Sequence, residues 1–179
     1  MIRRATDADT GRIAEILVFN NRIFYSPIFR DLGFSFGEYT VLAACREVRS
    51  SPEFAGGVYV WDDGVIRGFA AVVGRELTKL YVDPFFQHQG IGAHLLDYAV
   101  KTCGARTLWA LEKNEGALRF YARHGFKPAG EWKYEEGTRE RLVRMERKSY
   151  TKSAEKLMFF RTLCVLVPGG RLISPHGLN

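Results

Sequence analysis

The stretch that most constrains the fold is residues 76–100, ELTKLYVDPFFQHQGIGAHLLDYAV. Residues 77–82 alternate apolar side chains with others, which is typical of a half-buried strand. Asp83-Pro84 then ends the strand, because proline has no N–H to donate to a neighbouring strand. Apolar residues return at helical spacing at Leu95, Leu96, Ala99 and Val100. The sequence therefore predicts a strand, a glycine-bearing turn and a helix.

The turn, residues 87–92, reads Gln-His-Gln-Gly-Ile-Gly. The first N–H groups of a helix lack intrahelical partners and carry the positive end of its dipole, and glycine lets a phosphate approach the backbone. Gly90 and Gly92 therefore indicate either a phosphate site or close packing of the helix on the sheet. No Gly-Lys-Ser/Thr follows and a third glycine is missing, so the turn is neither a P-loop nor a dinucleotide fingerprint.

A second motif follows along the chain. Residues 108–112 are typical of a short buried strand, residues 116–124 of a helix, and Gly125 stands where a glycine commonly ends a helix. In this order and at this separation the two motifs resemble those of the GNAT N-acetyltransferases. The family's Q/R-x-x-G-x-G/A motif is matched by Gln87, Gly90 and Gly92. Its N-x-x-A-x-x-F-Y-x-x-x-G-F motif is matched by Asn114, Ala117, Phe120, Tyr121, Gly125 and Phe126.

The resemblance implies an α/β fold of three layers. A mixed central sheet of about seven strands would carry helices on both faces, with the fourth and fifth strands splayed to admit acetyl-CoA. The GNAT domain would occupy residues 1–147. Residues 148–179 form a basic and apolar extension that either packs on a neighbouring chain, covers an exposed patch, or is an addition without a role. Packing on a neighbour would make the protein a homodimer.

The resemblance also implies where the cosubstrate binds. The pyrophosphate would meet the N–H groups of residues 89–93, and the pantetheine arm would lie beside residues 80–82, where the N–H of Val82 or Tyr81 would polarise the thioester carbonyl. Asn114 would hydrogen-bond the arm or order a water. The implied cofactor-binding residues are Leu80, Tyr81, Val82, Gln87, His88, Gln89, Gly90, Ile91, Gly92, Ala93, Asn114, Ala117, Phe120 and Tyr121.

Acetyl transfer to an amine needs a proton donor for the departing thiolate and a base for the amine. Tyr121 is the predicted acid, since a phenol with a pKa near 10 is protonated at neutral pH, although it could equally be a core aromatic beside Phe120. A lysine amine is neutral in only about one molecule in 10³ at pH 7. The base is predicted to be Glu76, Glu112 or ordered water. Either glutamate could instead be a solvated carboxylate at a strand end.

No sequence motif marks the residues of the acceptor pocket. Residues 23–34 are dense in aromatics without a clean period, and Phe24, Phe29 and Phe34 could pack beneath the sheet. In GNAT folds the loop between the first two helices forms a wall of the acceptor pocket. The resulting candidates for substrate contact are Asn20, Asn21, Tyr25, Phe29, Arg30 and Asp31.

Local patterns predict the remaining elements. Residues 2–5, 58–61, 65–73, 127–134 and 141–146 are predicted strands. A capping pair at Thr6 and Asp9 begins a helix with Ile13, Ile16, Leu17 and Phe19 inward, which residues 20–22 end or break. A second capping pair, Ser35 and Glu38, predicts a helix with Val41, Leu42, Cys45 and Val48 inward.

Composition excludes several classes of protein. The chain has 179 residues, 46% of them hydrophobic, and no run near the ~18 apolar residues that span a bilayer, so a membrane protein is not expected. Three widely spaced cysteines indicate neither disulfides nor a metal site and favour the cytoplasm. Of the net charge of +6, four charges belong to residues 148–179, so no basic patch marks the body for nucleic acid. The function predicted is acetyl-CoA-dependent acetylation of a primary amine on a small molecule or protein; the alternative is a CoA-binding sensor or scaffold.

Overall fold

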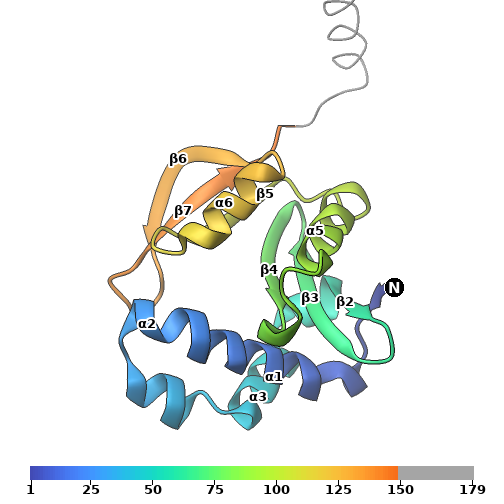
Figure 1. Ribbon diagram of the computed structural model, residues 1–179, viewed down its shortest axis with the longest axis vertical. Helices are drawn as coiled ribbons and strands as arrows, with labels where there is room; N and C mark the ends of the chain where they lie inside the picture. Colours follow the sequence, from blue (N-terminus) through green and yellow to red (C-terminus); the bar gives the residue numbers. More distant parts are fainter. Residues whose placement is uncertain (149–179) are drawn as a thin grey trace, which may run out of the picture. The chain divides into compact units, whose positions relative to one another are not determined.

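A seven-stranded mixed sheet is the centre of residues 1–148, the part of the chain that this computed structural model describes (Figure 1). The strands run in the order β1-β2-β3-β4-β5-β7-β6, and β4 and β5 form the parallel pair among antiparallel neighbours. Their bounds are β1 Ile2–Arg4, β2 Val58–Asp62, β3 Ile66–Val73, β4 Glu76–Val82, β5 Thr107–Leu111, β6 Lys127–Tyr134 and β7 Arg141–Glu146. The predicted sheet is confirmed.

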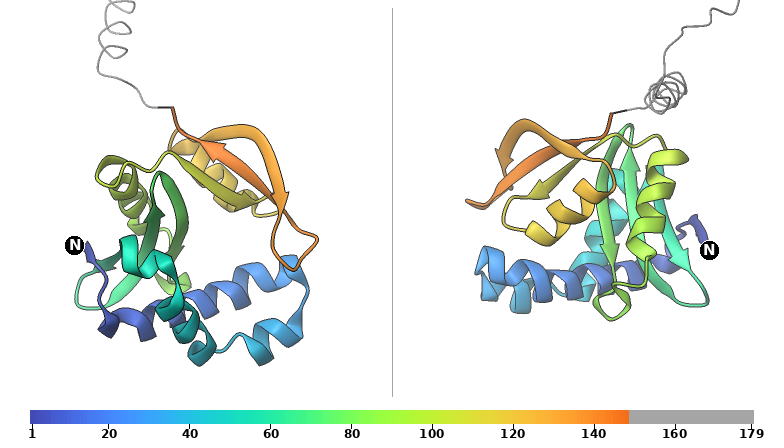
Figure 2. Two further views of the ribbon diagram at one scale, coloured as in Figure 1. Left: turned by 180° about the vertical axis from the view of Figure 1, so that it is seen from behind. Right: turned by 45° about the horizontal axis from the view of Figure 1, so that its top comes forward.

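Helices cover both faces of the sheet, as predicted. They are α1 Thr10–Asn20, α2 Ser26–Phe29, α3 Val41–Ser50, α4 Pro52–Gly57, α5 Ile91–Lys101 and α6 Glu115–Arg123. Strand β3 serves both faces, because its side chains alternate: Ala70 and Val72 pack with α5, and Phe69 and Ala71 pack with α1. Figure 2 shows α5 and the N-terminal helices on opposite sides of the sheet.

Strands β4 and β5 separate soon after they begin. They pair only at Glu76–Thr107 and Leu77–Leu108. The next residue of β4, Thr78, is an insertion relative to β3, since Leu77 and Lys79 pair with the adjacent residues Val72 and Ala71. Such a bulge bends a strand and increases its twist. The two strands therefore form a fork that opens toward the carboxyl end of β4, and the predicted splay is confirmed.

Helix α1 ends at Asn20, within the predicted residues 20–22, but the chain keeps a helical path beyond it. The chain continues through a π-helical turn, Asn21–Tyr25, directly into α2. The N–H of Asn21 still bonds the carbonyls of Leu17 and Val18. Pro27 lies in the first turn of α2 and has no N–H to donate to a carbonyl of the preceding π-helical turn. The helical run ends only at Arg30, which adopts a left-handed conformation with φ of 57°.

The two predicted capping pairs had different outcomes. The N–H of Thr6 does bond Asp9 Oδ2 at 2.7 Å, and a short 3₁₀ turn leads into α1. Ser35 and Glu38 lie instead in a second π-helical turn, Phe34–Glu38. Helix α3 begins at Val41, after Thr40, whose hydroxyl accepts the N–H of Ala43.

This later start changes the buried face of α3. Ala44 and Val48 lie in the core, whereas Val41 and Leu42 are 36% and 63% exposed. Cys45 is half-buried. The prediction therefore held for Val48 and was wrong for Val41 and Leu42.

Residues 149–179 lie outside the described residues, so the predicted role of the extension is untested. Among residues 1–148, none of the helices combines the length and apolar character needed to cross a bilayer.

Candidate active site

A cavity of about 590 Å³ lies in the fork, a volume ordinary for a small-molecule site. Four segments line it: the carboxyl half of β4, the turn before α5 with the first turn of that helix, α6, and residues 20–25. Of the predicted cofactor-binding residues, all except Gln89 line it. The further lining residues are Asn20, Phe24, Tyr25, Phe86, Gly116, Arg123 and His124.

The first backbone N–H groups of α5 lie at this cavity without partners in the helix. The first hydrogen bond of the helix joins His94 N–H to Gly90 O at 3.1 Å, so the N–H groups of Ile91, Gly92 and Ala93 have no helical acceptor. Gly90 has a φ of 83°, and His88 before it is also left-handed, at 62°. A Cβ on Gly92 would come within 3.5 Å of the Val82 side chain and 3.6 Å of Phe120. The turn thus combines an anion-accepting helix end with close packing, the two alternatives that its glycines suggested.

The backbone of Val82 faces the open side of the fork. On the other side, Asp83 N–H bonds Arg67 O of β3 at 2.8 Å, and because successive residues alternate, Tyr81 also directs its backbone toward β3. Val82 O instead accepts Asn20 Nδ2 at 3.0 Å and Gln87 Nε2 at 3.4 Å. Of the two N–H groups predicted to polarise a carbonyl, that of Val82 therefore points into the fork.

Three phenols line the cavity: Tyr25, Tyr81 and Tyr121. The ring centroids of Tyr25 and Tyr81 lie 6.1 Å apart in an edge-to-face arrangement, with the two hydroxyls within hydrogen-bonding reach. Tyr121 contacts Phe120 and Phe126 edge to face. Burial is the main cause that raises the pKa of all three phenols, and Tyr25 adds to the effect on Tyr121. All three hydroxyls are therefore protonated at neutral pH.

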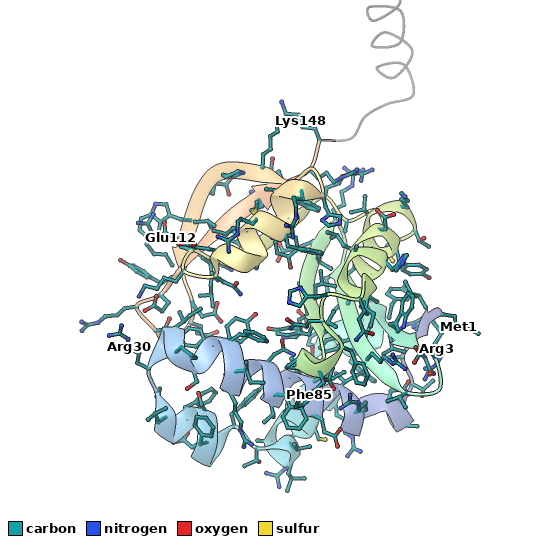
Figure 3. The ribbon with its side chains drawn as sticks, viewed as in Figure 1. Met1, Arg3, Arg30, Phe85, Glu112 and Lys148 are labelled. Carbon is teal, nitrogen blue, oxygen red and sulfur yellow. The ribbon has the colours of Figure 1, made fainter. Side chains whose placement is uncertain are left out.

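The two predicted carboxylate bases do not line the cavity. Glu76 lies at the closed end of the fork, in a separate shallow surface hollow together with Glu47 and Lys79. Glu112 follows β5, is about half exposed, and lies 3.6 Å from Arg141; Figure 3 shows it at the edge of the molecule. Among residues 1–148, no aspartate or glutamate lines the cavity.

Asn114 has a structural task in addition to lining the cavity. Its Oδ1 accepts the N–H of Ala117 at 3.0 Å and so caps α6. Its Nδ2 makes no hydrogen bond within the described part of the chain. The amide nitrogen is thus the group of Asn114 that remains available to a ligand.

The predicted acceptor residues divide into two groups. Asn20 and Tyr25 line the cavity. Asn21 is buried away from it, Phe29 packs on Tyr25, Asp31 caps Phe34 N–H, and Arg30 is exposed at the edge of the molecule (Figure 3). Phe24 and Phe34 are 39% and 41% exposed, so the prediction that they pack beneath the sheet was wrong.

Sequence reasoning missed Phe24, Phe86, Arg123 and His124 as lining residues. Arg123 and His124 follow Tyr121 within the second motif and could have been found from its helical spacing. Phe24 reaches the cavity through the π-helical turn, which no local pattern marked. Within residues 1–148, no group of three potential metal ligands occurs.

The comparisons with known proteins agree with this geometry. A family model described as an acetyltransferase (GNAT) domain matches residues 55–128. The peptidyl-lysine N-acetyltransferase YjaB of Salmonella typhimurium is 34% identical over 79 residues, 44% of this chain and 54% of that protein. The peptidyl-lysine N-acetyltransferase YiaC of Escherichia coli is 34% identical over 70 residues, 38% of this chain and 48% of the relative. The chain thus spans about half the length of the curated relatives it matches.

Solved structures extend the likeness in fold. The solution structure of apo YjaB from Escherichia coli superposes with a TM-score of 0.65 at 21% identity, covering 84% of this chain and 98% of that one. PaiA N-acetyltransferase from Thermoplasma acidophilum, solved in complex with coenzyme A, gives 0.57 at 20% identity, covering 83% and 98%. Both motifs thus lie on the forked sheet, and residues 55–128 of this chain carry the match to a GNAT acetyltransferase domain.

Proposed function

We propose that this protein transfers the acetyl group of acetyl-CoA to a primary amine by direct attack, with both substrates bound together. The observation that carries the proposal is the forked sheet. Its cavity joins an anion-accepting helix end, an unpaired strand N–H and a protonated phenol within one space.

The residues present fit the cosubstrate. The free N–H groups of residues 91–93 would hold the pyrophosphate, and no carboxylate from residues 1–148 lines the cavity to repel it. Arg123 adds a positive charge to the same lining. Asn114 Nδ2 and the open edge of β4 would receive the pantetheine arm, with Ala117 and Phe120 packing beside it.

Acetyl-CoA would supply its acetyl group as a thioester, whose C–S bond breaks as the C–N bond forms. The N–H of Val82 would stabilise the charge that develops on the carbonyl oxygen. Tyr121 would donate the proton that the sulfur takes up, since its raised pKa keeps the phenol protonated at working pH. Tyr121 would then recover a proton from solvent.

The amine must also lose a proton. Because Glu76 and Glu112 both lie off the cavity, we assign this step to water within it, the third alternative from the sequence. The neutral fraction of the amine would then set the rate at low pH.

The relatives named as peptidyl-lysine N-acetyltransferases support a protein lysine as one acceptor to test. A small-molecule amine remains the other. The predicted cytoplasmic location and a homodimer through the extension stay predictions.

Two measurements on the full chain test the proposal. Calorimetry with acetyl-CoA should register binding, and thiol release should depend on an added lysine peptide or small amine. Binding without thiol release across a broad panel of amines would favour a CoA sensor or scaffold. No binding at all would contradict both functions.

A further inference from the structure

Asn20, the last residue of α1, is a polar side chain that the proposed reaction has not yet used. It is only 5% exposed, yet it lines the cavity beside Val82 and Tyr25. A buried carboxamide at such a place has four hydrogen-bonding positions to satisfy, two donors on nitrogen and two lone pairs on oxygen. The partners of each atom therefore decide what Asn20 can do.

The nitrogen of this carboxamide is fully engaged. Nδ2 donates to Ile16 O at 2.8 Å and to Val82 O at 3.0 Å. Both partners are carbonyl oxygens, which can only accept, so the amide cannot be turned the other way round. The bond to Val82 ties α1 to the open edge of β4 across 62 residues of sequence.

The oxygen of Asn20 is left without a partner in residues 1–148. Asn21 Oδ1 next to it is also unpaired, but it is buried away from the cavity. Asn20 Oδ1 belongs to a residue that lines the cavity and is not among the buried unpaired atoms. It is therefore a fixed hydrogen-bond acceptor that a ligand in the cavity can reach.

The position of this oxygen indicates its ligand. Asn20 holds the carbonyl of Val82, and the N–H of the same residue faces the same side of β4. A group bonded to Asn20 Oδ1 thus lies beside the group that Val82 N–H polarises. Phosphate and carbonyl oxygens cannot donate to an amide oxygen, whereas an N–H group can.

Resting on the proposed function, we infer that Asn20 Oδ1 accepts a hydrogen bond from the acceptor's primary amine and orients its nitrogen toward the carbonyl held by Val82. An amide oxygen is neutral, and the described part of the chain adds no carboxylate to the cavity lining, so the site receives the amine without a counter-ion. The neutral amine suits this site, because one N–H can bond Asn20 while the lone pair remains free for attack.

The test uses acetyl-CoA and n-butylamine with the full chain and the variant Asn20→Ala. This variant removes the oxygen and also the two hydrogen bonds that Nδ2 donates to Ile16 O and Val82 O, although Gln87 still donates to Val82 O. We expect kcat/KM for butylamine to fall about 10-fold, as for the loss of one hydrogen bond of ordinary strength. The Kd for acetyl-CoA and the slow thiol release without amine report on the lost support of Val82, and both should change clearly less than kcat/KM for butylamine.

Val18→Ala is the matched control, because Val18 is fully buried in the same helix and carries no polar group. Asn20→Ser replaces the test variant should Asn20→Ala not fold, since its hydroxyl can still bond Ile16 O.

The inference is overturned by an unchanged kcat/KM in the Asn20 variant. It is equally overturned if amine-free thiol release falls as much as kcat/KM for butylamine, or if Val18→Ala lowers kcat/KM by the same factor. Either result would make the role of Asn20 structural. Failure of the wild type itself to acetylate butylamine would instead contradict the proposed function, and the inference with it.

Discussion

The cavity has two walls of different construction. The cofactor wall consists of residues 80–93 and 114–124, where short local motifs place backbone groups and the phenols of Tyr81 and Tyr121. The acceptor wall consists of residues 20–25, where a π-helical turn places Asn20, Phe24 and Tyr25. The first wall is built from helix ends whose geometry follows from nearby glycines and caps. The second depends on the contact between α1 and β4, which lie far apart in the sequence.

This difference separates the parts of the reaction. The cofactor wall holds groups that any acetyl-CoA-dependent transfer would need. The acceptor wall contributes the amide of Asn20, the ring of Phe24 and the phenol of Tyr25, none of them charged. The groups proposed for acetyl transfer are therefore readable from local sequence, whereas the residues proposed to meet the amine are brought to the cavity by tertiary structure.

The largest effect is expected on the cofactor wall, from Tyr121→Phe. Removing the phenol hydroxyl should lower kcat by roughly 10²–10⁴, the usual contribution of a general acid, while the Kd for acetyl-CoA changes little. Steady-state thiol release and calorimetry measure the two quantities. Tyr98→Phe, on the far part of α5, is the control. Near-wild-type turnover would remove Tyr121 from the mechanism.

The proposed role of Tyr121 also predicts the pH profile of the wild-type protein. Burial raises the pKa of Tyr121, so the acid stays protonated up to and beyond pH 10, its ordinary range. In the wild type, kcat/KM should rise with pH as the amine loses its proton, with no fall between pH 8 and pH 10 from loss of the acid. A descending limb near pH 8 would show that some other group donates the proton.

The next prediction concerns the stability of the ion pair that links the two walls. Asp83 is 2% exposed, binds the guanidinium of Arg12 on α1, and accepts the N–H of Phe85. Asp83→Ala leaves that arginine without its buried partner and should lower the free energy of unfolding by about 3–5 kcal/mol. Urea denaturation measures this loss. Asp97→Ala, which breaks an exposed pair with Lys101, should cost less than about 1 kcal/mol.

A loss no larger for Asp83→Ala than for Asp97→Ala would show that α1 is held to β4 by other contacts. The two walls would then be less interdependent than the ion pair suggests.

A smaller effect tests the turn before α5. Gly90→Val forces a β-branched residue to adopt a φ of 83°, a strain of about 1–3 kcal/mol, so the turn should rearrange and the Kd for acetyl-CoA weaken roughly 10- to 100-fold. A Cβ there would meet only the His94 ring, at 3.9 Å, so strain rather than a clash causes the loss. Gly64→Val, at a φ of 103° in the β2–β3 hairpin, carries the same strain without touching the cofactor wall. Equal affinities in the two variants would contradict the pyrophosphate placement.

The sequence predicted the elements of the cofactor wall better than the contacts that build the acceptor wall. The strand, turn and helix around Gly90 and the helix at Tyr121 depend on neighbours in sequence, so their patterns were visible. The bulge at Thr78 depends on register with β3, and the bond from Asn20 to Val82 spans 62 residues. Neither leaves a local pattern. The sequence predicted that residues 20–22 end or break the first helix, and α1 does end at Asn20, but no local pattern marked the π-helical turn that follows it.

The smallest effect is expected on the acceptor wall, from Tyr25→Phe. Its hydroxyl lies within reach of that of Tyr81, and losing it should raise the KM of an amine acceptor roughly 2- to 10-fold while the Kd for acetyl-CoA stays constant. Burial raises the pKa of Tyr25, so the phenol is neutral throughout and the effect should not vary between pH 6 and pH 9. Tyr39→Phe, whose hydroxyl bonds Glu47 away from the cavity, controls for the loss of a phenol in the same region of the chain. A change in acetyl-CoA affinity equal to the change in KM would mean that Tyr25 belongs to the cofactor wall, and that the two walls are not chemically distinct.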